Sequence, residues 1–597
     1  MKKQHKNLGN KNIPEYNTVK EIVVTGTERG GDRKQFVFLD KNRKECTRNY
    51  NQTWREISSF GTFLSLKGLN GQKKIAVIGE NCFEWMIAYY ATLCGGNISV
   101  PLDAKLPFED LEDQLIRCDC DAFVYTDYFI DFAEELKKNP KIKIQHYFCM
   151  DNFPEYLAIG TEALDNGNRD FLDAEVKPED LACIAYTSGT TAKSKGVMLT
   201  HKNIASDASS ACRVLSGKHA IGFMPLNHTY AWVSALFSSY ILIDWGYMCE
   251  SVRTIPNDLK KYKPYNFSGV PLVVEIIYDK IWKTAKKSGR EDILKKGIKI
   301  SNFLMKLGID KRREIFKTIH ESLGGNLSMI ICGGAWLDPK YEKGMHDFGI
   351  DIFNGYGLTE CSPSVTCNRP DKFRFGSVGT PLDCCEVKIN NPDEEGVGEI
   401  YVKGSNVMVG YYGEPEATAE AFDGEWFKTG DFGRIDKDGF LFMVGRKKNL
   451  IILSNGKNVS PEEIEEKVMT TIPYVKEILV YQDGDKILGE MFLNEEDYPD
   501  ARDKVDADIK AVNAEMPAFK RITKITIRDT EFPKTTTMKI KRYVEINKDK
   551  IANDPEVLVL IRKMLKYIYK EYSATVLKLD EIDVDSFIDA LYLTVRW

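Results

Sequence analysis

Apolar runs of strand length alternate with amphipathic stretches of helix length between about residues 50 and 260. The clearest strand candidates are 75–79, 97–101 and 122–126, and a helix candidate runs through 85–93. Alternation of this kind is typical of a parallel sheet with helices on its faces. This part of the chain is therefore predicted to have an α/β fold built on doubly wound sheets.

Two later regions follow other patterns. Residues 376–445 are rich in glycine and contain short alternating runs such as 399–403 and 440–444, which predict a small β-barrel-like subdomain. Ser460, followed by proline and by Glu463, is typical of a helix start.

A chain of 597 residues is too long for one core. We expect an N-terminal domain over 1–445, with the β subdomain at about 376–445, a small mobile α+β domain over 446–545, and a helical tail of unknown role over 546–597.

Composition narrows the class of protein. The chain has 82 basic and 88 acidic residues and a net charge of −6, which argues against a nucleic-acid-binding protein. The N-terminus lacks the apolar run of a signal peptide, and the longest apolar stretch, around 231–243, is too short to span a bilayer. Fourteen scattered cysteines lack the spacing of a zinc site and suit reduced thiols. We therefore expect a cytoplasmic protein that binds no nucleic acid.

Residues 280–317 stand out by charge. They carry 13 lysines and arginines against 4 acidic residues, a local net charge of +9, on a helical pattern. One interpretation is a solvated helical face. The other is a patch that contacts the inner face of a membrane as a peripheral protein.

The most informative segment for chemistry is 186–197, which follows an apolar, strand-like run at 181–185. Glycines, hydroxyl side chains and two lysines, Lys193 and Lys195, can cradle phosphate oxygens. The segment is not a Walker loop, because its lysine precedes the glycine at 196. A polar surface turn is the alternative interpretation.

Four further segments carry groups suited to a nucleotide. In 354–360, Tyr356 can stack on adenine and Glu360 can bind magnesium, although a tight turn around a packed tyrosine would look the same. In 428–431, Asp431 after a tight turn can accept hydrogen bonds from ribose, unless it is a simple turn aspartate. The basic cluster from residue 445 is a candidate hinge. The lysines of 533–541 suit an oxyanion or phosphate, or form a basic surface loop.

Taken together, over about residues 30–545, these five segments resemble the adenylate-forming superfamily of acyl-CoA synthetases, adenylation domains and luciferases. The resemblance is strongest to long-chain fatty acyl-CoA synthetases. Residues 224–229 resemble the segment whose histidine, here His228, lies beside the acyl pocket, and 332–335 resemble the turn that flanks adenine. The resemblance implies two steps. A carboxylate attacks the α-phosphate of Mg-ATP to give acyl-adenylate and pyrophosphate, and the thiol of coenzyme A then displaces AMP.

The resemblance also implies roles for individual residues. The catalytic set is Lys539, His228, Thr187 and Glu360, with Lys539 bridging carboxylate and phosphate, and with Thr187 and Glu360 at the magnesium ion. The remaining residues implied in nucleotide and coenzyme A binding are Ser188, Gly189, Thr190, Thr191, Lys195, Gly333, Gly334, Ala335, Asn354, Gly355, Tyr356, Gly357, Thr359, Asp431, Arg446, Lys448 and Gly456. Among these, Asp431 and Arg446 hold the ribose, Lys448 is the hinge of the small domain, and 454–460 form the pantetheine channel.

Several alternatives stay open. The chain has Ala192, Ser194 and Met538 where the family usually has glycine, proline and glycine. No acidic residue follows His228 before Asp244, which favours an apolar acid over an amino acid and leaves aromatic acids open. The acceptor is coenzyme A or an acyl carrier protein, and a degenerate synthetase that acts as a scaffold is the non-enzymatic alternative. Monomer and homodimer are both compatible with the sequence. The tail is a helical appendage or, from a faint resemblance at 582–588, part of a carrier domain.

Overall fold

The computed structural model describes residues 12–187, 194–214, 219–249, 253–452, 458–484, 486–534 and 540–546. The chain divides into two compact units between Lys539 and Ile540. Every sheet belongs to the first unit, and the described part of the second contains the helix α19 (Arg542–Ile546). None of the described helices is long and apolar enough to cross a membrane.

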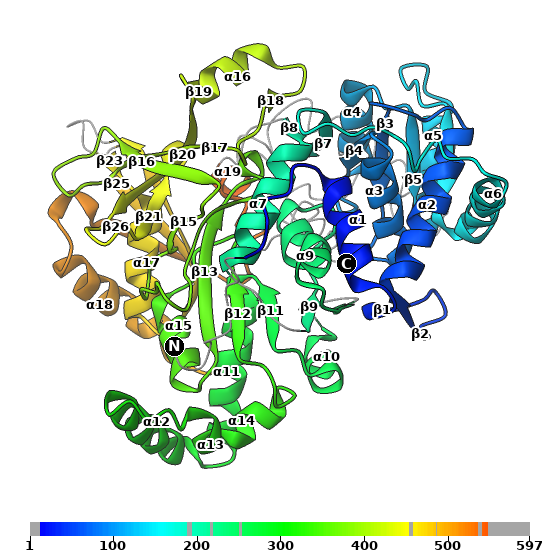
Figure 1. Ribbon diagram of the computed structural model, residues 1–597. Helices are drawn as coiled ribbons and strands as arrows, with labels where there is room; N and C mark the ends of the chain where they lie inside the picture. The colour runs from blue at the N-terminus through cyan, green and yellow to red at the C-terminus, as the bar shows by residue number, and fades with distance from the viewer. Residues whose placement is uncertain are drawn as a thin grey trace, which may run out of the picture. The chain divides into compact units, whose positions relative to one another are not determined.

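A seven-stranded sheet confirms the predicted strand–helix alternation (Figure 1). Its strands, in spatial order, are β18 (Gly410–Tyr411), β8 (Gly196–Thr200), β7 (Leu181–Tyr186), β4 (Ile98–Pro101), β3 (Lys74–Ile78), β5 (Ala122–Tyr125) and β6 (His146–Cys149). The strands from β7 to β6 are parallel, whereas β8 and β18 join as antiparallel edge strands. The predicted strands at 75–79, 97–101 and 122–126 are therefore correct to within a residue or two.

Side chains that alternate along β3 explain how both faces of this sheet are covered. Ile75 and Val77 belong to the main core, together with α2 (Tyr50–Leu66) and α3 (Phe83–Cys94). Ala76 and Ile78 point to the other face and pack with α4 (Phe108–Cys118) and α5 (Ile130–Leu136). Such alternation follows from the two-residue period of a strand. Helix α6 (Phe153–Asp165) then packs on α2.

The second large sheet has nine strands, of which the central six are parallel. In spatial order they are β15 (Thr380–Pro381), β14 (Ser364–Cys367), β13 (Asp351–Gly357), β12 (Met329–Cys332), β11 (Asn266–Gly269), β9 (Ala220–Gly222), β10 (Gly246–Met248), β1 (Lys34–Leu39) and β2 (Glu45–Asn49). Three helices lie between the two sheets in Figure 1: α1 (Val19–Gly30), α7 (His201–Val214) and α9 (Ser238–Leu242). One continuous apolar core joins these layers.

Helices on the outer side of this sheet follow its connections. They are α10 (Ile255–Tyr262), α11 (Pro271–Lys287), α12 (Glu291–Lys306), α13 (Arg312–Ile315), α14 (Lys317–Ser322) and α15 (Pro339–Asp347). The basic helical pattern predicted at 280–317 is thus divided among several helices inserted between β11 and β12.

The predicted β subdomain contains an antiparallel sheet. Its strands are β16 (Cys385–Asn390), β17 (Gly398–Gly404), β20 (Trp426–Ile435), β19 (Phe422–Asp423) and β21 (Leu441–Arg446), and α16 (Pro415–Ala421) precedes β19. The tight turn predicted before Asp431 is wrong, because residues 428–431 lie inside β20. The chain bends there at Gly430, whose φ is +70°, and the pairing of β20 with β17 shifts register beside it. Glycine adopts this left-handed conformation readily, so the segment is a β-bulge rather than a turn.

A small α/β region with its own apolar core completes the first unit. It contains β22 (Ile451–Ile452), β23 (Asn458–Val459), α17 (Pro461–Thr471), β24 (Val475–Asp483), β25 (Lys486–Leu493), α18 (Ala501–Ala514) and β26 (Ile522–Arg528). The predicted helix start is confirmed, since the Ser460 hydroxyl accepts a hydrogen bond from the backbone of Glu463 at the beginning of α17. The predicted domain boundaries and the mobility of this region stay predictions.

Candidate active site

Two predicted segments meet where β12 and β13 end. Cys332 pairs with Asn354 across the two strands, so Gly333 to Ala335 follow β12 beside the last residues of β13. A methyl group added to Gly333 would lie 3.6 Å from the carbonyl oxygen of Gly355 and 3.9 Å from Cζ of Tyr230. The segments are therefore in close contact at the carboxyl edge of a parallel sheet, which is the usual place for a nucleotide in α/β folds.

The Gly-Tyr-Gly sequence is not the tight turn that the sequence left open. It forms the extended end of β13, which pairs there with β14. A side chain on Gly357 would come within 2.0 Å of the carbonyl oxygen of Pro363. Glycine is needed at this position because the neighbouring backbone approaches too closely for any Cβ. The arrangement leaves Tyr356 between two small residues.

Tyr356, Asp431 and Arg446 form a connected group. The Tyr356 hydroxyl donates a 2.7 Å hydrogen bond to Oδ2 of Asp431, and Nε of Arg446 lies 3.2 Å from Oδ1. Asp431 and Arg446 face each other across β20 and β21, and the Thr429 hydroxyl accepts a bond from the backbone N–H of Asp431. Burial raises the pKa of Tyr356 well above its ordinary value, which keeps its hydroxyl a donor. The carboxylate is thereby held in one orientation by both of its oxygens.

Glu360 and Lys195 are linked through a residue that the sequence analysis missed. The Tyr411 hydroxyl donates a 2.9 Å hydrogen bond to Oε1 of Glu360, and Nζ of Lys195 lies 4.7 Å from the centre of the Tyr411 ring. Tyr411 is placed by the pairing of β18 with β8, opposite Val197. Its signal in the sequence is the pair of tyrosines that follows Gly410.

The segment 186–197, predicted to cradle phosphate, includes Lys195, and the structure describes both of its ends. The backbone N–H of Thr187 donates a 3.0 Å bond to the carbonyl of Lys195, so the two ends of the segment are adjacent. Ser194 is bound to α4: its hydroxyl accepts a bond from Gln114, and its carbonyl accepts one from Arg117. Thr359 begins a short 3₁₀ helix that carries Glu360. Ser188, Gly189, Thr190 and Thr191 lie outside the described residues.

The chemistry of Glu360 and Thr187 suits magnesium. Both offer hard oxygen ligands, and burial raises the pKa of Glu360 above its ordinary value. Within the described ranges, no group of three histidine, cysteine or acidic residues could hold a metal ion by itself. Magnesium at this place would therefore take most of its ligands from phosphate oxygens and water.

The segment predicted as a hinge follows directly on Arg446. Lys447 pairs with Glu399 at 2.8 Å, whereas Lys448 is exposed in a short 3₁₀ helix. The Ser460 hydroxyl donates a 2.9 Å bond to the carbonyl of Val444, which brings the start of α17 against the end of β21. Few contacts therefore restrain Lys448 itself. Its role as a hinge stays a prediction, and Gly456 and Lys539 lie outside the described residues.

His228 is the N-cap residue of the short helix α8 (Thr229–Ala231), whose last residue lines a cavity in the central core. The cavity lies between strands β9, β10 and β11 and the helical layer. Most of the residues that line it are apolar, among them Phe36, Met86, Met224, Leu226, Ala231 and Met248. Glycine at 222 and 246 leaves room at the strand surface. Tyr230 precedes Ala231, which lines the cavity, and its hydroxyl donates a 3.0 Å hydrogen bond to the carbonyl of Ile331 in β12.

Comparison with known proteins identifies the family. Residues 25–412 match the AMP-binding enzyme family, and residues 448–548 match the C-terminal domain of AMP-binding enzymes. The chain belongs to the AMP-binding enzymes. This confirms the predicted adenylate-forming superfamily and the prediction that the protein is an enzyme.

Relatives of this AMP-binding enzyme are named as ligases that join an acid to coenzyme A or to an acyl carrier protein. Long-chain-fatty-acid–CoA ligase 5 of Mus musculus is 30% identical over 470 residues, which cover 72% of this chain and 68% of that protein. A long-chain-fatty-acid–[acyl-carrier-protein] ligase of Arabidopsis thaliana is 27% identical over 566 residues, or 81% of this chain and 77% of that protein. The solved structure of an anthranilate CoA ligase with anthranoyl-AMP shares the fold, with a TM-score of 0.73 at 21% identity over 90% of this chain and 98% of that one.

Proposed function

We propose that this AMP-binding enzyme activates a medium- or long-chain fatty acid with Mg-ATP and then transfers the acyl group to coenzyme A. In the first step, a carboxylate oxygen attacks the α-phosphorus, and the bond to pyrophosphate breaks. In the second step, the thiol sulfur attacks the acyl carbon, loses its proton and expels AMP. The names of the relatives support this reaction class.

The apolar cavity between the central strands and the helical layer is the observation that carries the proposed substrate. It is lined by methionine, leucine and phenylalanine side chains, and two of its lining residues, Leu226 and Ala231, flank His228 in the sequence. Among the described residues that line it, none is charged. An amino-acid substrate would leave its ammonium group unpaired in such a cavity, at a high cost in free energy. A hydrocarbon chain gains free energy from the same surroundings.

The described side chains can hold ATP in the orientation that the first step needs. Tyr356 and Arg446 each hold one oxygen of Asp431 and so orient the carboxylate that would accept hydrogen bonds from the ribose hydroxyls. Tyr356 offers a ring face to adenine. Lys195 supplies positive charge to the phosphates, and Glu360 and Thr187 would hold magnesium, which supplies charge neutralisation to the triphosphate.

Lys539 is proposed to neutralise the charge that gathers between carboxylate and α-phosphate during adenylation. The role rests on its place in the C-terminal family match and on the chemistry of an ammonium group. Lys539→Ala should abolish pyrophosphate release and spare thioester formation from supplied acyl-adenylate. The control is Lys541→Ala, which removes a neighbouring lysine and should spare both steps. Equal loss in both half-reactions of the Lys539 variant would contradict the role.

The second candidate acceptor is an acyl carrier protein. It is favoured by the similarity to the acyl-carrier-protein ligase over 81% of this chain. Both acceptors predict the same first step and differ only in the second. Comparing free coenzyme A with a purified acyl carrier protein as the acceptor therefore separates the two candidates.

Pyrophosphate release measured over a series of acids tests the whole proposal. The series runs from acetate through octanoate to palmitate and includes benzoate, each with and without coenzyme A. We expect release to rise with chain length and thioester to form only when coenzyme A is present. Preference for benzoate would make the protein an aryl-CoA ligase. Failure to release pyrophosphate with every acid would leave the non-enzymatic scaffold as the better account.

A further inference from the structure

The helical insertion between β11 and β12 contains a helix that is packed on one side only. Helices α12, α13 and α14 lie together in Figure 1, with α11 leading into them. On the inner side of α12, Ser301 is buried, and Leu294 and Ile298 pack against the main core. The insertion is also where lysines and arginines outnumber acidic residues most strongly. Nothing in the proposed reaction uses these residues.

The outer side of α12 carries an exposed apolar stripe. Ile293, Ile300, Phe303 and Leu307 are 67%, 56%, 62% and 61% exposed. Their spacings of seven, three and four residues place them on one helical face. Over these 14 residue steps the stripe runs for about 21 Å along the helix. Ile309, 46% exposed, continues it beyond the helix end. A stripe of this length exceeds the scattered apolar residues found on most protein surfaces.

Three exposed lysines accompany the stripe. In helical register, Lys296 falls within it, and Lys299 and Lys306 border its outer edge. Lys295, further round the helix, pairs with Glu291 at 2.7 Å. By contrast, the three lysines of the stripe make no ion pair with any residue in the described part of the chain. Their long stems can lie along an apolar surface while their ammonium groups reach polar or anionic partners.

We propose that this face of α12 docks on the surface of an anionic lipid bilayer. The four apolar side chains enter the boundary between headgroups and acyl chains, and the three lysines contact lipid phosphates. An apolar face bordered by lysines is the pattern of helices that lie in a membrane interface. A bilayer offers both the apolar region and the negative charge along the whole stripe, without the complementary shape that a protein partner would need.

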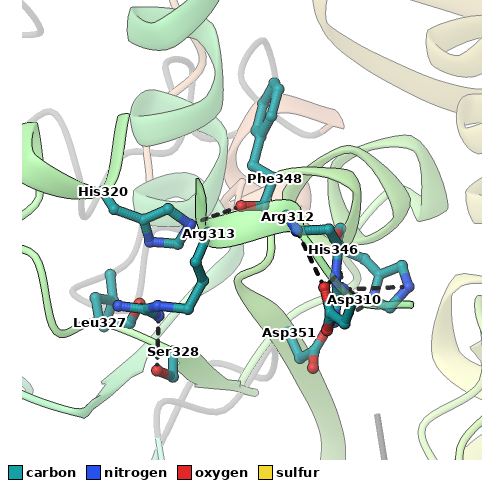
Figure 2. Close-up of polar contacts among 9 residues, drawn as sticks. All are labelled: Asp310, Arg312, Arg313, His320, Leu327, Ser328, His346, Phe348 and Asp351. Atoms are coloured by element: carbon teal, nitrogen blue, oxygen red, sulfur yellow. Dashed lines mark hydrogen bonds and ion pairs between the residues drawn. The ribbon is translucent and has the colours of Figure 1, made fainter. Parts of the chain in front are cut away.

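A buried ionic cluster fixes the segment that follows this helix to the sheet (Figure 2). The Arg312 side chain, fully buried, lies 2.8 Å from Oδ2 of Asp310 and 3.3 Å from Oδ1 of Asp351, and it also donates to the carbonyl of His346. Burial disfavours the charged guanidinium, yet Asp310 and Asp351 raise the pKa of Arg312 above its ordinary value, so it stays charged. Asp351 is the first residue of β13, the strand that ends at Gly357.

Further bonds hold the same region. Arg313 donates to the carbonyl of Leu327 and to the Ser328 hydroxyl, and Nε2 of His320 donates to the carbonyl of Phe348 (Figure 2). The segment that follows α12 is therefore attached firmly to the sheet that carries Tyr356. Docking of the helix would give the nucleotide-binding edge a fixed orientation with respect to the membrane.

Co-sedimentation of the full chain with vesicles tests the proposal. Vesicles of equal parts phosphatidylcholine and phosphatidylglycerol are compared with vesicles of phosphatidylcholine alone. We expect binding to the anionic vesicles that weakens with added salt, and much weaker binding to the neutral ones. The variant Ile300→Ser/Phe303→Ser/Leu307→Ser and the variant Lys296→Glu/Lys299→Glu/Lys306→Glu should each lose at least an order of magnitude in binding.

Matched variants on another surface serve as controls. Tyr128→Ser/Ile130→Ser removes two apolar side chains that are 65% and 45% exposed, and Lys105→Glu/Lys138→Glu/Lys141→Glu reverses three exposed lysines. Both should bind like the unchanged protein, and unchanged thermal unfolding of every variant shows that the fold is intact. The proposal is overturned if the unchanged protein fails to bind anionic vesicles, or if the α12 variants bind as well as the controls. Retention on immobilised polyglutamate without vesicle binding would point instead to an acidic protein partner. These readouts do not depend on the enzymatic reaction.

Discussion

The Tyr356 hydroxyl has a measurable role, because it orients the carboxylate proposed to bind ribose. Replacing Tyr356 with phenylalanine removes the 2.7 Å bond to Asp431 and keeps the ring. A hydrogen bond to a charged group contributes about 1.5 kcal/mol or more, so we expect ATP to bind roughly tenfold more weakly. Titration calorimetry with ATP measures the change, and Tyr128→Phe on the surface is the control. Unchanged affinity would show that Asp431 needs no such support.

Glu342 gives a prediction about pH. Burial raises its pKa to about 8 from an ordinary value of 4.5, although one oxygen accepts a bond from the backbone of Gly376. The folded protein therefore binds a proton that the unfolded chain releases between these two values, and stability should fall as pH rises through this range. Glu342→Gln cannot ionise, so its melting temperature should decline less over the same range. If the melting temperatures of the two proteins declined by the same amount over this pH range, ionisation of Glu342 would not be the cause.

At the scale of single residues, a short segment predicts the chemistry of a side chain but not the residues that it contacts. Tyr356 and Asp431 were each predicted from a short segment and Arg446 from the family resemblance, and the structure brings the three into contact. Tyr411 was missed because its contact with Glu360 spans 51 positions of the chain. No local sequence pattern identifies a contact between residues that far apart in the chain. The position of Tyr411 is set by the pairing of β18 with β8.

Among the elements, the helical insertion depends on the buried cluster around Arg312. Arg312→Met would leave Asp310 and Asp351 without their cation, and breaking a buried ion pair from one side costs about 3–5 kcal/mol. We expect a lower free energy of unfolding by that amount in urea denaturation. Lys311→Met is the matched control, since the Lys311 side chain is exposed and its only described ion pair is with Glu314. A loss no larger than that of the control would mean that the cluster contributes little stability.

Strands and helices with a clear apolar period were predictable, whereas short glycine segments were not. The apolar run at 75–79 predicted β3 almost to the residue, because a strand that is buried on both faces of a parallel sheet has apolar side chains at successive positions. Residues 428–431 and 354–357 look like turns in isolation. Both are extended, because pairing with neighbouring strands decides between a turn and a bulge. The sequence of a four-residue segment does not show which strands it pairs with.

For the whole molecule, the order of five segments predicted the family better than any one segment did. Each segment alone had an ordinary explanation as a turn or a basic surface. The family matches over 25–412 and 448–548 confirm the superfamily, whereas the roles of the individual residues stay predictions. The substrate and the acceptor are less predictable. They depend on the shape of the cavity and on contacts with a second molecule, which composition and spacing do not encode.

A substitution at Lys448 tests whether rotation of the small domain allows one site to carry out two reactions. Lys448 is exposed in a short 3₁₀ helix between β21 and β22, where a change of one backbone angle would turn everything that follows. Proline fixes φ near −65°, so Lys448→Pro should hold the present arrangement. We expect one half-reaction to persist within a few-fold and the other to fall by at least an order of magnitude.

Single-turnover measurements of pyrophosphate release and of thioester formation from supplied acyl-adenylate separate the two half-reactions. Glu394→Pro is the matched control, because it places proline in an exposed turn that is closed by a bond from Gly396 to Asp393. It should leave both half-reactions unchanged. Selective loss in the Lys448 variant alone would support a hinge, since a fixed hinge blocks only the reaction that needs the other arrangement. Equal loss of both half-reactions would instead show that proline damages the end of β21, where Arg446 lies.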